Sequence, residues 1–264
     1  MTSPILVTGG TGTLGRLVVP RLLAAGRPVR VLSRRGGDHA EAAPGAGTAA
    51  TVEYVAGDLL ADQGIDAALA GVQTVLHLAG GPKGDDEATR HLVRAAVGTG
   101  QVRHLVYVSV IGADKVPLGW FRAKRDAERA VAGSGLPWTT LRAAQFHDLA
   151  LTVVEKMAKL PMIPVPGSLR FQPVDAREVA DRLVELALGE PAGLVPDLAG
   201  PTVYGLDELS RGYLRARGRR RPMLPVRMPG AAGRAYRSGD NLSLAGATVG
   251  RRSWEEFLAE RVTR

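Results

Sequence analysis

The chain has 264 residues, a net charge of +8 and a hydrophobic content of 45%. This size suits one large α/β domain, or one domain with a smaller appended lobe. The absence of cysteine excludes disulfides, thiolate catalysis and cysteine-based metal sites. No apolar run approaches the roughly 20 residues that span a bilayer, and no basic and apolar leader is visible, so we expect a cytoplasmic protein without a membrane anchor.

The N-terminal segment predicts a strand, a tight turn and a helix. The apolar run Ile5–Val7 leads into Gly9, Gly12 and Gly15, and a helix-like stretch occupies residues 14–23. Gly9 allows a sharp turn, Gly12 allows backbone N–H groups to approach a pyrophosphate, and Gly15 allows the helix to pack against the strand. The helix N-terminus adds free N–H donors and a partial positive charge. The segment therefore predicts a dinucleotide site, against the alternative of a glycine-rich turn without a ligand.

Strand-like and helical patterns alternate through the first half of the chain, which is typical of βαβ units and a parallel sheet. We predict strands at residues 5–8, 29–33, 52–56, 74–78, 104–109 and 138–142, with helices near 14–25, 62–70, 86–98 and 121–133. Residues 36–50, rich in glycine and alanine, are interpreted as a loop or an irregular helix. The fold class predicted for residues 1–145 is α/β, a doubly wound parallel Rossmann sheet.

The alternation weakens beyond residue 145. We predict helices at 149–160, 176–188, 207–217 and 253–261, and loops or short strands at 161–167, 191–201 and 222–229. Residues 146–264 are therefore expected to form a smaller C-terminal α/β substrate lobe, with some segments returning to the sheet. In this architecture ligands bind at the carboxyl ends of the strands, where we expect the lobe to lie.

The end of the second strand indicates the cofactor. NAD-preferring sites place Asp or Glu there to bind the ribose 2′-hydroxyl, whereas this chain has Ser33, Arg34 and Arg35. An arginine can pair with a 2′-phosphate and lie against the adenine ring. The pattern favours NADP(H), and the alternative is a solvated loop after the strand.

Residues after the third and fourth strands extend this predicted site. Asp58, followed by Leu59, either accepts a hydrogen bond from the adenine amino group or caps the next helix. Ala79, Gly80 and Gly81 are small enough to let a cofactor approach, or they form an ordinary turn.

An arginine-rich segment near the C-terminus raises the question of a nucleic-acid partner. It comprises Arg211, Arg215, Arg217, Arg219, Arg220 and Arg221. Tyr213 is the one aromatic residue within it, which is too few for a base-stacking platform, so we expect no nucleic-acid partner. The histidines lack the spacing of a metal site, so we also expect no metal.

Taken together, the motifs resemble those of the atypical short-chain dehydrogenase/reductases, and within them the NmrA-like NAD(P)-binding group. The matching segments are residues 8–15, 57–59, 77–80, 106–109, 122–124 with Glu128, 141–142 and 172–180. The resemblance implies a Rossmann domain with a smaller substrate lobe. It also implies that the cofactor contacts the glycine motif with Thr11, Thr13 and Leu14, the arginine of the second strand, Lys124, and the segment holding Gln145 and Phe146.

The same resemblance implies a catalytic Ser, Tyr and Lys, the last two spaced Tyr-x-x-x-Lys on one helix face. Ser109 and Lys124 match, but Trp120 occupies the tyrosine position. An indole N–H donates a hydrogen bond but does not release a proton near neutral pH. The substitution leaves three readings: a reductase whose proton comes from water or another group, a cofactor-bound enzyme without ordinary carbonyl reduction, or a non-catalytic NADP(H) sensor.

Other residues near the implied site remain candidates. His147 is a candidate proton donor, with a purely structural role as the alternative. Trp120 and Phe121 are a candidate apolar wall, extended by Phe146, Met157 and Met162, or else they pack in the core. We predict an NADPH-dependent oxidoreductase acting on a small carbonyl, quinone or enone-like substrate, as a monomer or homodimer. The alternative is a regulatory protein that binds NADP(H) without turnover.

Overall fold

The computed structural model describes residues 3–36 and 51–262, so the loop or irregular helix predicted at 36–50 lies, apart from Gly36, outside the described residues. The strands are β1 (Ile5–Thr8), β2 (Val29–Ser33), β3 (Val52–Ala56), β4 (Thr74–His77), β5 (His104–Val110), β6 (Trp138–Ala143), β7 (Ile163–Pro166), β8 (Arg170–Phe171), β9 (Gly193–Leu194), β10 (Leu198–Ala199), β11 (Tyr204–Gly205), β12 (Met223–Val226) and β13 (Thr248–Val249). The helices are α1 (Gly15–Ala24), α2 (Ile65–Leu69), α3 (Asp85–Thr99), α4 (Gly119–Ala132), α5 (His147–Met157), α6 (Ala176–Leu188), α7 (Leu206–Ala216), α8 (Gly230–Ser238) and α9 (Trp254–Arg261).

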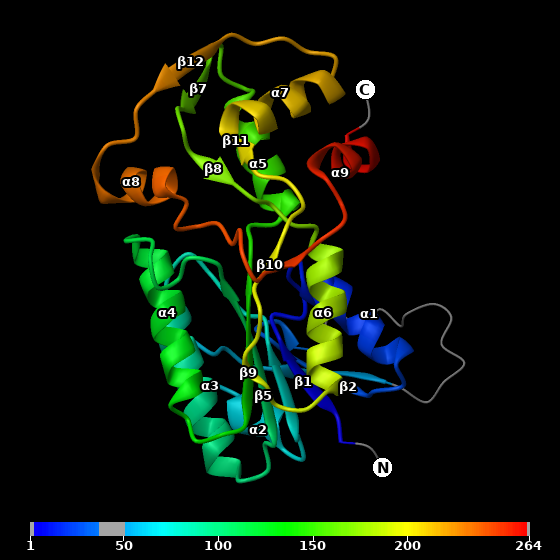
Figure 1. Ribbon diagram of the computed structural model, residues 1–264. Helices are drawn as coiled ribbons and strands as arrows, with labels where there is room; N and C mark the ends of the chain where they lie inside the picture. The colour runs from blue at the N-terminus through cyan, green and yellow to red at the C-terminus, as the bar shows by residue number, and fades with distance from the viewer. Residues whose placement is uncertain (1–2, 37–50, 263–264) are drawn as a thin grey trace. The chain divides into compact units, whose positions relative to one another are not determined.

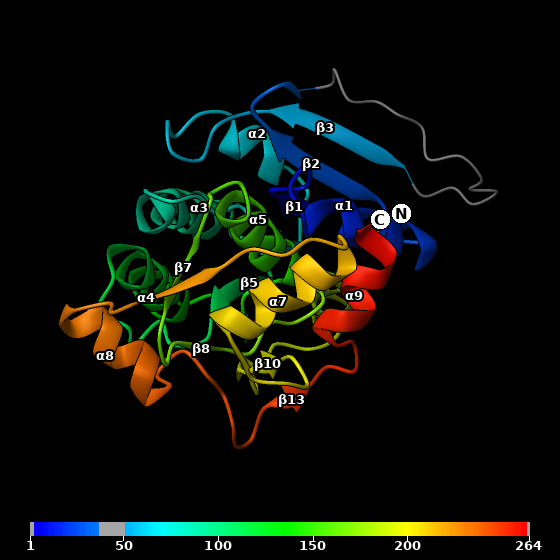
Figure 2. The same ribbon diagram turned by 90° about the horizontal axis from the view of Figure 1, so that it is seen from above.

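The central sheet confirms the predicted α/β class. It has nine strands in the order β13-β10-β6-β5-β4-β1-β2-β3, with β9 paired to β6. β1 pairs in parallel with both β2 and β4, and Figure 2 shows β1, β2 and β3 side by side. Figure 1 shows α3 and α4 on one face of the sheet and α1 and α6 on the other. The strand order reverses between β1 and β4, which is the switch point where doubly wound sheets bind ligands.

The chain divides into two compact units that interleave along the sequence. The first unit is Met1–Ser109, Ala123–Leu141 and Val179–Val195, and the second is Val110–Arg122, Arg142–Glu178 and Pro196–Arg264. The grouping differs from a single division after residue 145. Most of α6 and the short strand β9 return to the first unit because they pack and pair there, as Thr139 of β6 does with Gly193 of β9.

The core of the first unit explains its helices. Leu69 of α2, Leu92 of α3 and Val131 of α4 pack on Leu6 and Leu105 of the sheet, and all five side chains are buried. These helices therefore share one apolar layer against the strands, as expected for strands that are apolar on both faces. On the other face, an ion pair of 2.6 Å joins Arg21 of α1 to Asp181 of α6.

The second unit has its own core, built around α9. Trp254 and Phe257 are 0% and 1% exposed and pack with Tyr213 and Leu214 of α7 and Val154 of α5. The helices α5, α6, α7 and α9 lie close to the predicted ranges. Helix α8 was not predicted, because Gly230 and Gly233 have low helix propensity and Tyr236 is its one large apolar side chain.

Candidate functional site

A cavity of about 1090 Å³ opens in the first unit beside the switch point of the sheet. Its lining includes most of the predicted cofactor residues: Gly9, Thr11, Gly12, Ser33, Arg34, Arg35, Asp58, Leu59, Ala79, Gly80 and Gly81. Four segments that follow β1, β2, β3 and β4 thus meet at one place. The carboxyl ends of parallel strands lie at the same edge of a sheet, so the fold brings them together.

The glycine motif forms a tight cradle at this edge. Gly9 has φ +70°, and a Cβ atom there would lie 2.6 Å from the backbone nitrogen of Ala79. A Cβ atom on Gly15 would lie 2.3 Å from the carbonyl oxygen of Gly9, so the start of α1 packs directly on the turn. Leu14, the N-cap residue of α1, gives no side-chain cap hydrogen bond, which leaves this helix end suited to an anion.

The end of β2 presents two exposed cations. Arg34 and Arg35 are exposed and line the cavity, and within residues 3–36 and 51–262 neither guanidinium has an ion-pair partner. Arg16 of α1 also lines the cavity, with its Nε donating to the carbonyl oxygen of Thr11 at 3.0 Å. The cavity therefore carries positive charge where the sequence predicts the 2′-phosphate and pyrophosphate.

Asp58 has a structural role in this geometry. Its Oδ1 accepts hydrogen bonds from the backbone N–H groups of Leu60 and Ala61, at 2.9 and 3.4 Å. It caps the turn after β3 rather than helix α2, which begins only after Gly64 in the left-handed conformation. Asp58 also lines the cavity, so an adenine contact stays a prediction.

A buried chain of hydrogen bonds supports the cavity floor. The Thr89 hydroxyl donates to the Asp85 carbonyl oxygen at 2.6 Å, so Nε2 of His77 donates to Thr89 Oγ1 at 3.0 Å. Nδ1 of His77 then accepts from the hydroxyl of Thr8 at 2.6 Å, and Thr8 lines the cavity. Burial, together with the charge of Lys124, lowers the pKa of His77 to about 3, so this imidazole is neutral. His77 is therefore a buried histidine with both ring nitrogens hydrogen-bonded.

Lys124 lies in α4 and is buried in an ion pair. Its Nζ is 3.0 Å from Oδ2 of Asp85 and 5.3 Å from the centre of the Tyr107 ring. The Tyr107 ring also stacks on His77, with centroids 5.3 Å apart. Tyr107 is fully buried, and burial followed by the charge of Asp85 raises its pKa well above the usual value. Tyr107 is therefore a core residue and not a proton donor.

The remaining candidates for catalysis occupy different surroundings. Ser109 lies at the end of β5, with its hydroxyl buried and without a hydrogen-bond partner among the described residues. Trp120, in the second unit, is partly buried and makes an edge contact with Phe121 at 5.0 Å between ring centroids. Phe121 in turn contacts Tyr236 of α8, so Trp120 belongs to a small aromatic cluster. The roles of Ser109 and Trp120 stay predictions.

His147 begins α5 in the second unit and is 0% exposed. Its ring packs against Trp254 and Phe257, with centroids 5.8 and 5.1 Å apart. Burial lowers its pKa to about 4, despite the opposing charge of Asp175. A neutral, enclosed imidazole is a poor proton donor near pH 7, and a catalytic role of His147 stays a prediction.

The other predicted cofactor residues do not line the cavity. Thr13, Leu14 and Gly15 belong to the glycine motif but are not among the lining residues, and Lys124 lies behind the lining residue Asp85 in its ion pair. Gln145 and Phe146 belong to the second unit, and their predicted contact with the cofactor stays a prediction. Sequence reasoning missed Thr8, Arg16, Lys83 and Asp85, which do line it. Arg16 follows the last glycine of the motif directly, which was an available signal, whereas nothing local distinguishes Asp85 from Asp86 and Glu87.

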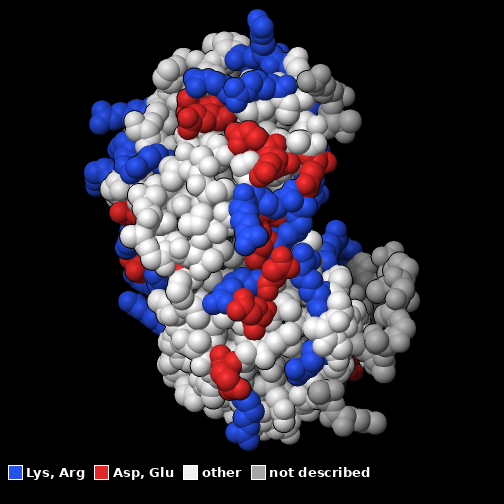
Figure 3. Space-filling view, turned by 45° about the vertical axis from the view of Figure 1, so that its right-hand side comes forward, with Lys and Arg blue, Asp and Glu red and all other residues white. Residues whose placement is uncertain are grey.

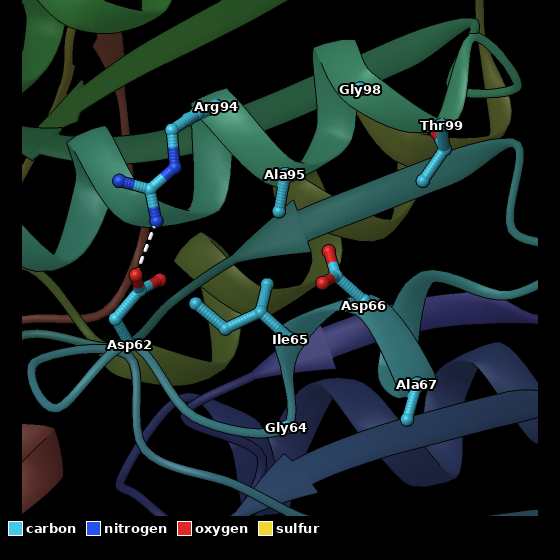
Figure 4. A pocket seen from close by; sticks show the side chains of 9 residues that line it. All are labelled: Asp62, Gly64, Ile65, Asp66, Ala67, Arg94, Ala95, Gly98 and Thr99. Atoms are coloured by element: carbon cyan, nitrogen blue, oxygen red, sulfur yellow. Dashed lines mark hydrogen bonds and ion pairs between the residues drawn. The ribbon is translucent and has the colours of Figure 1, made fainter.

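A second cavity of about 550 Å³ lies between α2 and α3, away from the cradle. Figure 4 shows Asp62 and Arg94 paired at one end and Asp66 near the middle. Small residues, Ala95 and Gly98, form much of its wall. None of the predicted site residues lines this cavity, so the larger cavity is the candidate cofactor site.

The surface does not present one continuous charge on the face drawn in Figure 3, where acidic and basic side chains are interspersed. In the arginine-rich segment, Arg211 pairs with Asp207 at 2.7 Å. Among the described residues, no group of three or more His, Cys, Asp or Glu could hold a metal ion. No helix in the described part of the chain is long and apolar enough to cross a membrane.

Comparisons with known proteins agree with this geometry. Residues 9–187 match the family described as NAD(P)H-binding. The chain is 33% identical over 219 residues to the (4-alkanoyl-5-oxo-2,5-dihydrofuran-3-yl)methyl phosphate reductase of Streptomyces griseus, covering 81% of this chain and 74% of that protein. It is 30% identical over 220 residues to the NAD(P)H azoreductase of Xenophilus azovorans, with the same two coverages, 81% and 74%.

Solved structures share the fold at lower identity. The NADPH-dependent quinone oxidoreductase of Escherichia coli, complexed with NADPH, aligns with a TM-score of 0.79 at 19% identity, over 97% of this chain and 99% of that one. The triphenylmethane reductase of Citrobacter, complexed with NADP(H), aligns with a TM-score of 0.75 at 21% identity, over 98% and 99%.

Proposed function

We propose that this chain, which belongs to the NAD(P)H-binding family and is an NAD(P)H-dependent oxidoreductase, prefers NADPH and reduces conjugated, electron-poor organic acceptors. The proposed preference for NADPH rests on the charge at the end of β2. Arg34 and Arg35 line the cavity without ion-pair partners among the described residues, and no carboxylate occupies the ribose-binding position. Two arginines favour a 2′-phosphate that an acidic residue would repel.

Different residues of the first unit would bind different parts of the cofactor. The Gly9–Gly15 cradle and the uncapped start of α1 would hold the pyrophosphate, and Arg34 the 2′-phosphate. Lys124 would anchor the nicotinamide ribose. When bound, the nicotinamide supplies a hydride. Ser109 would donate a hydrogen bond to the oxygen of the acceptor.

The proposed class of hydride acceptor follows from the replacement of the usual catalytic tyrosine, which would act as the general acid. Trp120 replaces the usual phenol, Tyr107 holds its proton tightly and His77 is neutral, so none of these three side chains is a strong proton donor. Hydride addition to an isolated ketone creates a strongly basic alkoxide that needs an acid. Addition to a quinone or enone creates a delocalised anion that water protonates. Relatives named for a quinone, an azo compound and a dye support this class.

Calorimetric titration with NADPH, NADP⁺, NADH and NAD⁺ tests the cofactor preference. We expect NADPH to bind at least about tenfold more tightly than NADH, and Arg34→Glu to remove that difference. Arg103→Glu, which makes the same charge change at an exposed position outside the cavity, is the control. Equal affinity of wild type for NADPH and NADH would contradict the preference.

NADPH oxidation with a 1,4-benzoquinone and with an unconjugated aliphatic ketone tests the acceptor class. We expect the ketone to react at least about 100-fold more slowly, since a general acid contributes that much or more. Trp120→Tyr is expected to gain ketone reduction. Equal rates for the two acceptors in wild type would overturn the proposal. NADPH binding without turnover of any acceptor would favour a regulatory protein, which the loss of the usual acid also suits.

A further inference from the structure

We propose that Asp85 is a positioning residue of the cofactor site, holding Lys124 with one carboxylate oxygen and the turn after β4 with the other. The inference rests on the proposed function, in which Lys124 anchors the cofactor. Asp85 is the first residue of α3 and lines the cavity. Its side chain is only 5% exposed, and that of Lys124 is 9% exposed.

The two oxygens of the Asp85 carboxylate contact different groups. Oδ1 accepts a hydrogen bond from the backbone N–H of Gly81 at 2.6 Å. Oδ2 lies 3.0 Å from Nζ of Lys124. Gly81 lines the cavity, whereas Lys124 comes from α4, 39 positions after Asp85 in the chain (124 − 85). One buried carboxylate therefore ties the cavity wall to the cation.

The turn leaves the ammonium little freedom. A Cβ atom on Gly80 would lie 3.2 Å from Nζ of Lys124 and 3.4 Å from Oδ2 of Asp85. The ammonium thus lies directly against the backbone of Gly80, a residue that lines the cavity. The ring of Tyr107, 5.3 Å from Nζ, lies within cation–π range. Groups from α3, from β5 and from the turn after β4 together set the position of Lys124.

The backbone of Asp85 is held as firmly as its side chain. Its carbonyl oxygen accepts the Thr89 hydroxyl, which continues through His77 to Thr8 on the cavity wall. Because a buried carboxylate is costly without its partners, the whole arrangement favours one geometry of Lys124 and the turn. Asp85 touches neither substrate nor the reacting atoms in this account, so it acts through Lys124.

Asp85→Asn removes the charge of the side chain but keeps its size and shape. An asparagine keeps an oxygen that can accept from Gly81 but removes the negative charge facing Lys124. We expect NADPH to bind about tenfold more weakly, as for the loss of a charge-assisted contact. Asp86→Asn is the matched control, because Asp86 is the next residue of the same helix and pairs instead with Arg90 at 2.9 Å. We expect its NADPH affinity to match wild type.

A double-mutant cycle with Lys124→Met distinguishes positioning from a general loss of stability. If Asp85 acts through Lys124, then Asp85→Asn changes NADPH affinity less than about twofold in the Lys124→Met background. If Lys124→Met alone does not fold, because it leaves the buried carboxylate of Asp85 uncompensated, the comparison of Asp85→Asn with Asp86→Asn still tests the inference. Equal effects of Asp85→Asn in both backgrounds would refute the inference, as would unchanged affinity in Asp85→Asn. Failure of the wild type to bind NADPH would instead refute the proposed function.

Discussion

We expect acidification to destabilise the first unit in part through the buried base His77. The folded pKa of about 3 lies below the ordinary value of 6.5, because burial and the charge of Lys124 oppose protonation. Between pH 6.5 and 3 the unfolded chain therefore binds more protons than the folded chain, and stability falls as the pH falls. At pH 5.0 this linkage costs about 2 kcal/mol relative to pH 7.5, and about 5 kcal/mol once the pH lies below 3.

The His77→Gln variant isolates this contribution, because glutamine does not titrate. Urea unfolding at pH 7.5 and pH 5.0 gives the loss of unfolding free energy for each protein. We expect that loss to be about 2 kcal/mol smaller in His77→Gln than in wild type, whatever the stability of the variant at pH 7.5. His147→Gln serves as the parallel case in the second unit, where a folded pKa of about 4 predicts a similar reduction. Equal losses in wild type and His77→Gln would show that His77 accepts a proton in the folded protein, and the reasoning would fail.

Two further substitutions test the cradle and the second unit. We expect Gly9→Ala to abolish NADPH binding and to lower stability by more than Gly26→Ala does. Both glycines have positive φ, but only at Gly9 would a Cβ atom meet backbone, 2.6 Å from the nitrogen of Ala79. Similar melting temperatures for the two variants would contradict this expectation. Asp175→Asn is expected to lower the free energy of unfolding in urea by about 3 kcal/mol, because Asp175 is a buried carboxylate paired with Arg177 at 2.7 Å and Arg252 at 2.9 Å. An unchanged urea midpoint would show that these ion pairs are dispensable for stability.

The sequence by itself determined the framework of the first unit. Apolar runs bounded by glycine and polar residues predicted β1, β2 and β3 with the bounds that the structure has. The spacing of Gly9, Gly12 and Gly15 predicted the cradle, because each glycine answers a local steric demand. Such features depend on neighbours along the chain, and so they can be read without knowing how distant segments pair.

Helix α8 is an element that the local sequence did not predict. Gly230–Ser238 contains two glycines and one large apolar residue, Tyr236. Ala235 and Tyr236 join a cluster with Phe121, more than 100 positions earlier in the chain (235 − 121 = 114). Tertiary packing, rather than local propensity, specifies this helix.

The candidate site was decided in the same way by the tertiary structure. Asp85, Asp86 and Glu87 are equivalent as a sequence, but only Asp85 is oriented toward Lys124 by the first turn of α3. His77 reads as a histidine at a strand end until the fold places Thr8 and Thr89 on its two ring nitrogens. Partners so far apart in sequence leave no local pattern, because their contact exists only after β1, β4, α3 and α4 have packed together.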